Sequence, residues 1–351
     1  MRAALLGCGR VAEHYRKMLL EIDPVDRFEV VAVCDTDPDK AARLAQAFGC
    51  PAFRDAATML DAGAIDVMFV LTPSGHHFAH ARLALENGVS VVCEKPVTMT
   101  PEEAAALDTL AETRGLFCAT VFQNRWNRAL RAAKAAVETG RLKTLVTASV
   151  RLHWCRYQDY YEDGWHGTWA MDGGVINQQA IHHLDALQWI CGPVDAVCAV
   201  AANRMNTLEA EDTLAAVLRF KSGALATIEA TTAARPRDFE ASLSVVGEGG
   251  RIRVGGIALN RIDEWDLVNA SEDDATLAAR CSVEVPSGYG LSHSLYIRDL
   301  VDSVERRTRP DITIASAMST LRLVHALYAS VETGAWVRLD DNPRSSRLGR
   351  S

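Results

Sequence analysis

Paired cysteine motifs are missing from this chain of 351 residues. Its nine cysteines lie scattered along the sequence, and no two of them take the C-x-x-C spacing. An odd, scattered set disfavours both a zinc site and a disulfide framework, so we expect no bound metal. Reduced thiols are typical of the cytoplasm, where we expect this protein to reside.

Long apolar runs and a surplus of basic residues are missing as well. No run approaches the roughly 20 apolar residues that span a bilayer, and the opening RAALLGCG has too short an apolar stretch for a signal peptide. The formal net charge of −8 argues against broad attraction to phosphate backbones or anionic lipid. We therefore expect neither a nucleic-acid partner nor a membrane partner.

What is present is an ordinary globular composition, 48% hydrophobic and 23% charged, in a chain long enough for two domains. In residues 1–121, apolar runs of strand length alternate with stretches of helical spacing. The apolar runs cover 3–7, 30–35, 67–72, 89–94 and 116–122. This alternation predicts an α/β N-terminal Rossmann domain, that is, a doubly wound parallel sheet.

Residues 122–340 follow a different pattern. Short turns separate β-type runs at 145–154, 194–202, 213–220, 224–233, 240–247 and 250–255, and helical stretches precede and follow them. The pattern predicts an α+β domain with an open, mainly antiparallel sheet and helices on one side. The exposed sheet face needs a cover, which predicts a homodimer or homotetramer, and the polar residues 341–351 predict a flexible tail.

A glycine-rich turn follows the first apolar run. The motif G-x-G-x-x-A allows a tight turn, lets the backbone approach a pyrophosphate and lets the next helix pack closely on the strand. The N-terminus of that helix then offers N–H donors to phosphate. We predict a dinucleotide site formed by Gly7, Cys8, Gly9, Arg10, Val11 and Ala12.

Asp35 ends the second apolar run, where dinucleotide-binding folds place a carboxylate that binds the ribose hydroxyls. Asp37 stands two residues later, and two carboxylates at this position would repel a 2′-phosphate. We therefore expect NAD in preference to NADP. An exposed helix cap is the alternative interpretation of Asp37.

Three further motifs carry a family resemblance: TPSGHH at 72–77, EKP at 94–96 and DGGVINQQAIHHLD at 172–185. Together with the glycine turn they resemble the glucose-fructose oxidoreductase, inositol dehydrogenase and MocA family over nearly the whole chain. The resemblance implies an NAD(P)-dependent dehydrogenase that acts on CH–OH groups of sugars. It also implies cofactor contacts from Thr72, Pro73, His77, Glu94, Lys95 and Gln123.

Lys95 follows the end of a predicted parallel strand, where open α/β sheets bind their ligands. Its ammonium group can exchange a proton with a substrate hydroxyl and stabilise the oxyanion that develops as hydride leaves. The resemblance places a catalytic imidazole at His182, which suits the same proton transfer. On a helix His182 shares a face with Asp185, whereas His183 points elsewhere.

Gln178 departs from the family pattern, which often has aspartate four residues before the histidine. A neutral amide can hydrogen-bond the imidazole, but it cannot stabilise an imidazolium by charge. We therefore expect Lys95 to be the principal acid/base and His182 to be its partner or a positioning residue.

Two segments resemble a nucleotide-sugar branch that oxidises UDP-N-acetylglucosaminuronate at carbon 3: FQNRW at 122–126 and the stretch from Tyr160 to Trp169. His166 replaces the arginine usual there. Rings can stack on a sugar and guanidinium groups can bind phosphate or carboxylate, although core packing and solvated ion pairs are alternative interpretations. The substrate candidates are Lys95, Arg125, Arg156, Tyr161, Trp165, His166, Gln178 and His182.

Other functions stay open from sequence alone. A cyclitol dehydrogenase of the inositol type or a keto-sugar reductase would use the same motifs. A non-catalytic, NAD(P)-sensing regulator could also use this fold. Such a sensor has no need of both Lys95 and His182, so their joint presence favours an enzyme.

Overall fold

The computed structural model describes residues 1–350 and divides the chain into two units. The first unit holds Met1–Gln123 and Leu291–Met318, and the second holds Asn124–Gly290 and the residues from Ser319 onward. Sequence patterns place a boundary near residue 121, but they do not show that 291–318 returns to the first unit.

The returning segment is fixed by helix α10 (His293–Arg306). Ile297, Leu300 and Val301 form its buried stripe, and such a stripe needs an apolar partner. The Tyr296 hydroxyl donates to the carbonyl of Thr120 at 3.0 Å, so the helix is also hydrogen-bonded to the end of strand β6 (Cys118–Thr120).

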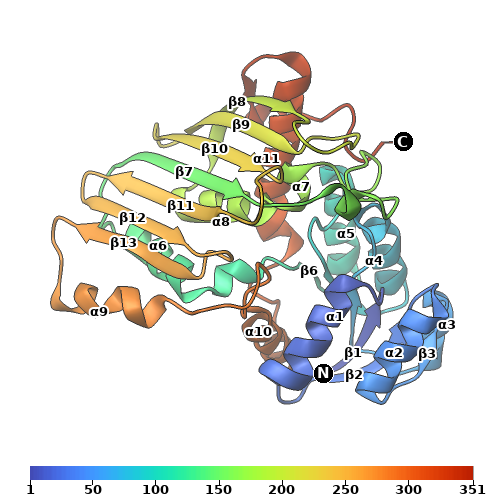
Figure 1. The fold of residues 1–351 in the computed structure, drawn as a ribbon. Coiled ribbons are helices and arrows are strands. Elements are labelled where there is room, and N and C mark those ends of the chain that lie inside the picture. The colour runs from blue at the N-terminus through green and yellow to red at the C-terminus, as the bar shows by residue number, and fades with distance from the viewer. Residues whose placement is uncertain (351) are drawn as a thin grey trace. The chain divides into compact units, whose positions relative to one another are not determined.

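A six-stranded parallel sheet forms the first unit, in the order β3-β2-β1-β4-β5-β6 (Figure 1). The other strands are β1 (Arg2–Leu6), β2 (Glu29–Cys34), β3 (Ala52–Phe53), β4 (Val67–Val70) and β5 (Ser90–Cys93). The helices between strands are α1 (Arg10–Lys17), α2 (Pro38–Phe48), α3 (Ala56–Ala62), α4 (His77–Glu86) and α5 (Pro101–Thr113). Every residue of β4 and β5 is buried, as expected for strands covered on both faces. The predicted doubly wound sheet is confirmed. The sequence does not predict β3, because its two residues are too few to form a recognisable pattern.

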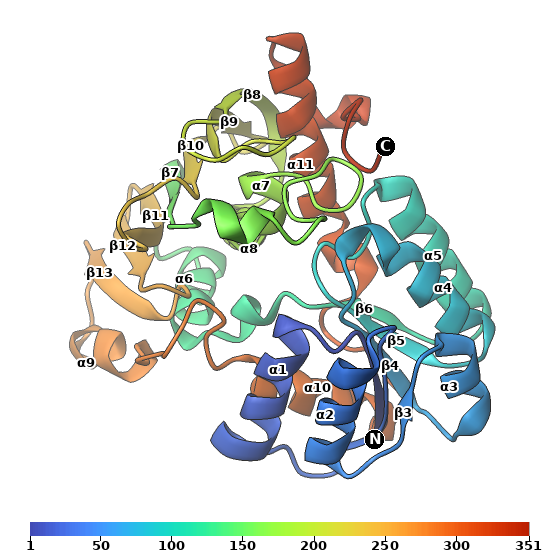
Figure 2. The same cartoon turned by 45° about the vertical axis from the view of Figure 1, so that its right-hand side comes forward.

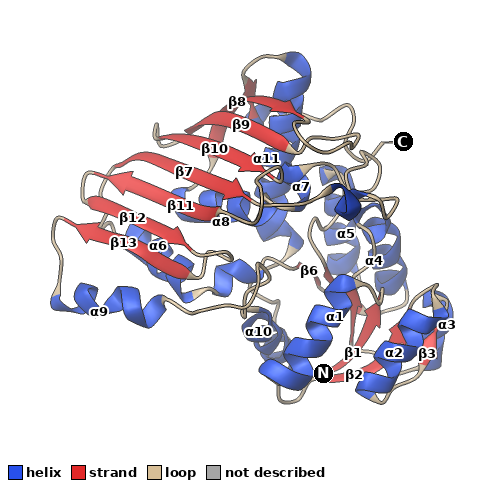
Figure 3. Ribbon diagram, viewed as in Figure 1, coloured by secondary structure: helices blue, strands red, loops and turns tan. Residues whose placement is uncertain are grey.

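An eight-stranded sheet forms the second unit, in the order β13-β12-β11-β7-β10-β9-β8-β14 (Figure 3). Its strands are β7 (Leu145–His153), β8 (Val194–Ala202), β9 (Thr213–Phe220), β10 (Leu225–Thr231), β11 (Glu240–Gly247), β12 (Gly250–Gly255), β13 (Arg261–Leu267) and β14 (Val337–Arg338). All neighbouring strands are antiparallel except β7 and β10, which confirms the predicted, mainly antiparallel sheet. Because His153 pairs with Thr231, β7 and β10 end at the same edge.

One face of this sheet is covered by helices (Figure 2). Along β7, the buried residues Ala148, Val150 and Leu152 alternate with outward-facing positions, and helix α8 (Ile181–Cys191) packs against β7 and β11. Helices α6 (Arg128–Glu138), α7 (Val175–Gln178), α9 (Glu272–Cys281) and α11 (Ile314–Thr333, from Ser319 onward) complete the unit. We call the opposite side, which carries Thr147, Ser149 and Arg151, the open face.

The last described residues contact the second unit. Leu348 is buried and the Ser345 hydroxyl donates to Glu332 on α11 at 2.6 Å, although sequence polarity predicts a flexible tail. All nine cysteines are free thiols. Within residues 1–350, no helix combines the length and the apolar character that crossing a membrane requires.

Candidate active site

The glycine turn of the first unit has the geometry its sequence predicts. Gly7 has a φ of +97°, and a Cβ there would lie 2.8 Å from the carbonyl carbon of Leu71, so no larger residue fits. A Cβ at Gly9 would meet no atom within 4 Å, which leaves open space beside the backbone before α1. The turn therefore has room for a ligand at a helix N-terminus.

Asp35 lies directly beside this turn. Its carboxylate accepts from the backbone N–H of Cys8 at 2.7 Å and from the N–H of Asp37 at 2.8 Å. Asp37 itself is the N-cap of α2 and accepts from the N–H groups of Asp39 and Lys40. The Asp35 carboxylate is thus fixed beside the glycine turn, where ribose binding is predicted for it, and Asp37 serves as a helix cap, the alternative left open by sequence.

His77 links two of the family motifs. Its Nδ1 lies 2.7 Å from the carbonyl oxygen of Pro96, and its Nε2 lies 2.8 Å from that of Thr72, which precedes Pro73. The ring is 1% exposed, and burial lowers its pKa to about 4. A neutral imidazole has one N–H, so it donates to one of these carbonyls at a time. His77 therefore joins the loops that leave β4 and β5.

Glu94 and Lys95 follow β5. The buried Glu94 carboxyl accepts from the Tyr15 hydroxyl at 3.2 Å and from the backbone N–H of Lys95 at 3.2 Å. Burial raises the pKa of Glu94. The Lys95–Pro96 peptide bond is cis. Lys95 is held at its backbone by a buried acid at the carboxyl edge of a parallel sheet.

Two buried polar atoms near this edge lack partners. Within residues 1–350, Gln123 Oε1 and Thr120 Oγ1 make no hydrogen bond. A carboxamide oxygen of this kind is suited to accept from an amide of a bound ligand, such as the nicotinamide carboxamide. The glycine turn, the Asp35 carboxylate and this acceptor together fit a nicotinamide dinucleotide.

In the second unit, the neighbouring residues His182 and His183 of helix α8 differ in their burial. His183 is 2% exposed, packs edge-on to Trp154 and has its pKa lowered to about 4 by burial. His182 is only partly buried, in the first turn of the helix. His183 is thus a neutral core residue, and His182 is the one suited to meet a ligand.

Gln178 donates through Nε2 to Asp172 Oδ1 at 2.5 Å. Asp172 is 1% exposed, and its other oxygen accepts from the backbone N–H of Gly167 at 2.8 Å. Sequence analysis missed Asp172. Its position directly before a Gly-Gly pair that leads into α7 is the only signal that could have identified it. The structure therefore supplies a carboxylate beside the amide where the family often has aspartate.

Arg125 forms a buried ion pair. Its Nε and Nη2 contact the two oxygens of Asp185 at 2.8 Å and 2.5 Å, and the Thr320 hydroxyl donates to the same carboxylate at 3.0 Å. Through these contacts Arg125 joins the 123–126 turn to α8 and α11, which is a structural role. The predicted contact between Arg125 and substrate stays a prediction.

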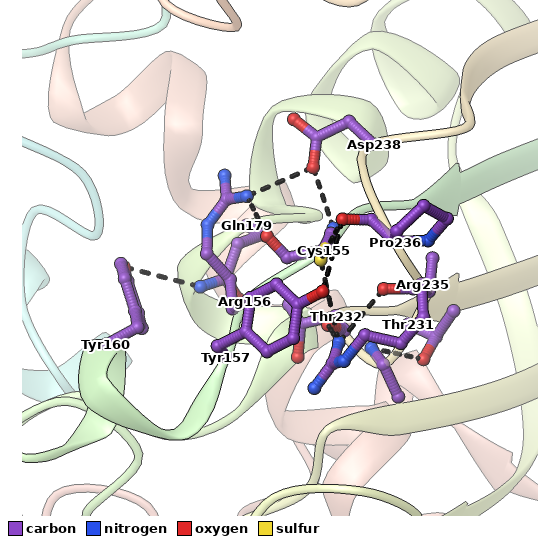
Figure 4. A network of polar contacts seen from close by, with 12 residues as sticks. Cys155, Arg156, Tyr157, Tyr160, Gln179, Thr231, Thr232, Arg235, Pro236 and Asp238 are labelled. Carbon is purple, nitrogen blue, oxygen red and sulfur yellow. Dashed lines mark hydrogen bonds and ion pairs between the residues drawn. The ribbon is translucent and has the colours of Figure 1, made fainter.

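Arg156 belongs to a network at the edge where β7 and β10 end (Figure 4). Its Nη1 donates to Asp238 at 3.1 Å, and its guanidinium lies 5.1 Å from the Trp154 ring centre and 5.7 Å from that of Tyr160. The Tyr160 hydroxyl in turn accepts from Gln179 at 3.5 Å. Arg156 is half-buried, so it remains a substrate candidate with one carboxylate partner.

The aromatic stretch packs largely on itself. His166 lies between Tyr160 and Trp165, with ring centres 4.3 Å and 3.6 Å away, and its Nδ1 is 2.5 Å from Asp163. Tyr161 bonds the Thr232 hydroxyl at 2.7 Å, and burial raises its pKa to about 12. Through the ring of Tyr160, which contacts the rings of Tyr161 and His166 and lies 5.7 Å from the Arg156 guanidinium, the structure gathers Tyr161, Trp165 and His166 into one ring cluster beside Arg156.

Comparison with known proteins places these features in a family. Residues 1–122 match the family model described as an oxidoreductase family with an NAD-binding Rossmann fold, and residues 134–339 match the C-terminal alpha/beta domain of the same family. The WlbA dehydrogenase from Bordetella pertussis, solved with NADH and UDP-GlcNAcA, is 34% identical, with a TM-score of 0.91 over 96% of this chain and 97% of that one.

Two further dehydrogenases are also similar to this chain. WlbA from Chromobacterium violaceum, also solved with NADH and UDP-GlcNAcA, is 32% identical, with a TM-score of 0.89 over 96% of this chain and 95% of that one. D-apiose dehydrogenase of Paraburkholderia graminis is 25% identical over 96% of this chain and 89% of its own length. The chain therefore belongs to the glucose-fructose oxidoreductase, inositol dehydrogenase and MocA family and is an NAD-dependent oxidoreductase that acts on CH–OH groups of sugars.

Proposed function

We propose that this enzyme oxidises a secondary hydroxyl of a nucleotide-activated amino-sugar uronate, with UDP-GlcNAcA as the candidate substrate and carbon 3 as the reacting centre. The observation that carries the proposal is the similarity, at 34% identity over nearly the whole chain, to a dehydrogenase solved with NADH and UDP-GlcNAcA. The FQNRW and WHGTW segments support the same branch of the family.

NAD would be held by residues 7–12 and by Asp35, with Thr72, Pro73, Glu94 and Gln123 contributing around it. Bound there, it supplies the acceptor for a hydride. Repulsion between the Asp35 carboxylate and a 2′-phosphate favours NAD over NADP.

Lys95 is proposed as the principal acid/base. Its amine takes the hydroxyl proton during oxidation, and the resulting ammonium stabilises charge on the substrate oxygen. His182 is proposed as its partner, to position the hydroxyl or share the proton. Gln178, fixed by Asp172, is proposed to orient the substrate beside His182.

The ring cluster formed by Tyr161, Trp165 and His166 is proposed to bind the sugar, with Arg156 as a contact for its anionic part. His166 pairs with Asp163, so it presents less uncompensated charge than the arginine usual in this branch. We therefore expect tolerance of sugars without a carboxylate.

A homodimer or homotetramer is proposed, with the open face of the second unit as the contact between copies. The free thiols suit a reducing compartment, and we propose the cytoplasm.

A substrate panel tests the proposal. We expect NADH formation with UDP-GlcNAcA, weaker turnover with UDP-GlcNAc, and none above background with free GlcNAcA or inositols. Preference for an inositol would establish the cyclitol alternative, and binding of NAD without turnover on any panel member would establish the regulator alternative.

A further inference from the structure

The chain on both sides of Lys95 is fixed by side chains of the first unit. Glu94 Oε2 accepts from the Lys95 backbone N–H at 3.2 Å. On the other side, His77 Nδ1 lies 2.7 Å from the carbonyl oxygen of Pro96. The Lys95 backbone therefore has a defined position at the carboxyl edge of the parallel sheet.

Tyr15 on α1 holds the side chain of Glu94. Its hydroxyl donates to Glu94 Oε1 at 3.2 Å, and both side chains are buried. Because α1 begins directly after the glycine turn, the helix proposed to face the NAD phosphates also supports the neighbour of Lys95. The Glu94 carboxyl thus uses one oxygen for α1 and the other for the amide of Lys95.

The Tyr15 ring is held from two directions. It packs edge-on against Phe69 of β4, with ring centres 5.7 Å apart, and against His293 of α10, with ring centres 5.5 Å apart. His293 Nδ1 in turn lies 3.2 Å from His14 Nε2. Close packing of this kind restricts the ring to one orientation, so its hydroxyl stays directed at Glu94.

Opposing influences act on the charge of Glu94. Burial raises the pKa of its carboxyl. The charge of Lys95, the Lys95 backbone N–H and the Tyr15 hydroxyl act against burial and favour the carboxylate. Because the attraction between the two charges is mutual, a Glu94 carboxylate also favours the ammonium form of Lys95.

Titratable residues surround this pair on α1, α4, α10, β5 and β6, and they are neutral near pH 8. They are Tyr15, Cys93, Cys118 and Tyr296, whose pKa values burial raises, and His14 and His77, whose pKa values burial lowers to about 4. Among these residues, Glu94 is therefore the negative charge that acts on Lys95.

We propose that Tyr15 is a positioning residue that keeps the Glu94 carboxylate beside Lys95 and thereby sets the pH at which Lys95 releases its proton. Tyr15 acts through Glu94. The inference rests on the proposed role of Lys95 as the acid/base of sugar oxidation.

Acetylation of Lys95 across a pH series tests the proposal without a sugar substrate. The full chain, with and without NAD, is treated briefly with acetic anhydride, and peptide mass spectrometry gives the fraction of Lys95 modified. An amine reacts only when it is unprotonated, so the midpoint of labelling against pH reports how tightly Lys95 holds its proton. Tyr15→Phe should lower this midpoint by about 0.5 to 1 pH unit, because Glu94 then takes a proton more readily.

Two further variants separate the role of Tyr15 from a loss of packing. Glu94→Gln removes the charge outright and should lower the midpoint by at least as much as Tyr15→Phe. The double variant Tyr15→Phe/Glu94→Gln should match Glu94→Gln alone, because Tyr15 acts through Glu94. Tyr296→Phe is the matched control. It removes an equally buried hydroxyl, which donates to the Thr120 carbonyl, and should leave the midpoint unchanged.

Kinetics on the same variants test the consequence for catalysis. A general base must be unprotonated to accept the hydroxyl proton, so the low-pH limb of kcat/KM for UDP-GlcNAcA should move to lower pH together with the labelling midpoint. The Kd for NAD should stay within about threefold in Tyr15→Phe, because Tyr15 is proposed to support Lys95 and not the cofactor.

Three results would overturn the proposal: an unchanged labelling midpoint in Tyr15→Phe or in Glu94→Gln, a further shift when Tyr15→Phe is added to Glu94→Gln, or an equal shift in Tyr296→Phe. A midpoint that moves as expected in a protein that oxidises no sugar of the panel would instead reject the proposed oxidation and leave the coupling of Tyr15, Glu94 and Lys95 in place. Failure of the two proposals is thus distinguished.

Discussion

Asp172 and Gln178 show how a departure from a family pattern is compensated within one unit. The amide of Gln178 donates to a carboxylate that is 1% exposed and six positions earlier in the chain. A carboxylate at 178 would instead face that of Asp172 in a buried site, where one of the two would have to hold a proton. The amide at 178 is therefore the complement of the acid at 172.

An exchange of the two groups tests this reading. Gln178→Glu should destabilise the protein by about 1–3 kcal/mol, because two buried acids then share one site. Adding Asp172→Asn restores one amide and one acid and should recover more than half of the loss. Urea unfolding of the wild type, both single variants and the pair measures the coupling. Additive effects would show that the two side chains do not interact.

Asp35 is the residue proposed to set the preference for NAD over NADP. At equal concentration NAD should stabilise the protein against heat more than NADP, because the carboxylate repels a 2′-phosphate. Asp35→Ser should reduce the ratio between the affinities for NAD and NADP by about tenfold. Asp35→Asn is the control, since an amide oxygen can still accept from the Cys8 N–H without charge. A larger thermal shift with NADP in the wild type would contradict the assignment.

At the scale of elements, His77 explains why the TPSGHH and EKP motifs occur together. It joins the loop after β4 to the loop after β5 through two carbonyl oxygens, and it is almost fully buried. The family resemblance implies that His77 contacts the cofactor. The geometry instead favours a role in which His77 positions the loop that carries Lys95.

Replacing His77 separates these roles. His77→Phe should lower kcat by about tenfold and leave the Kd for NAD within about threefold, because the loop after β5 loses an anchor. His76→Ala, one residue earlier, is the control. Steady-state kinetics and NAD titration measure both quantities. Weak NAD binding with unchanged kcat would restore the cofactor role.

The elements also show what sequence can predict. Both sheets can be predicted, because the pattern of apolar residues along a strand differs between parallel and antiparallel sheets. The glycine turn and Asp35 can be predicted because they depend on local chain geometry. The residues predicted less well are those whose partners are distant in sequence. Arg125 pairs with Asp185, 60 residues away, and α10 returns to a sheet formed by the first 120 residues. Such partners leave no local pattern.

At the scale of the whole molecule, buried acids make stability depend on pH. Glu211 is 4% exposed, accepts from the Ile176 N–H and the Tyr328 hydroxyl, and burial raises its pKa to about 8. Because the folded pKa lies above the unfolded value, the unfolded chain loses this proton first as pH rises. The stabilisation is complete below about pH 4.5 and is lost progressively up to about pH 8.

Glu211→Gln therefore has a pH-dependent effect. The amide copies the protonated acid and keeps an oxygen for Ile176 and Tyr328, so the variant should be more stable than wild type at pH 8 by on the order of 2 kcal/mol. The difference should vanish near pH 5. Thermal unfolding across this range measures it. A stability difference that is the same at both pH values would show that Glu211 does not titrate there.

In the proposed reaction, the enzyme moves hydride from carbon 3 of a nucleotide-activated uronate to NAD, and Lys95 acts as the acid/base. The most direct test supplies UDP-GlcNAcA with deuterium at carbon 3 and analyses the recovered NADH by mass spectrometry. We predict one deuterium per NADH and a turnover at least about 100-fold lower in Lys95→Met, with NAD affinity nearly unchanged. Unlabelled NADH would rule out hydride transfer from carbon 3, and full activity in Lys95→Met would rule out Lys95 as the acid/base.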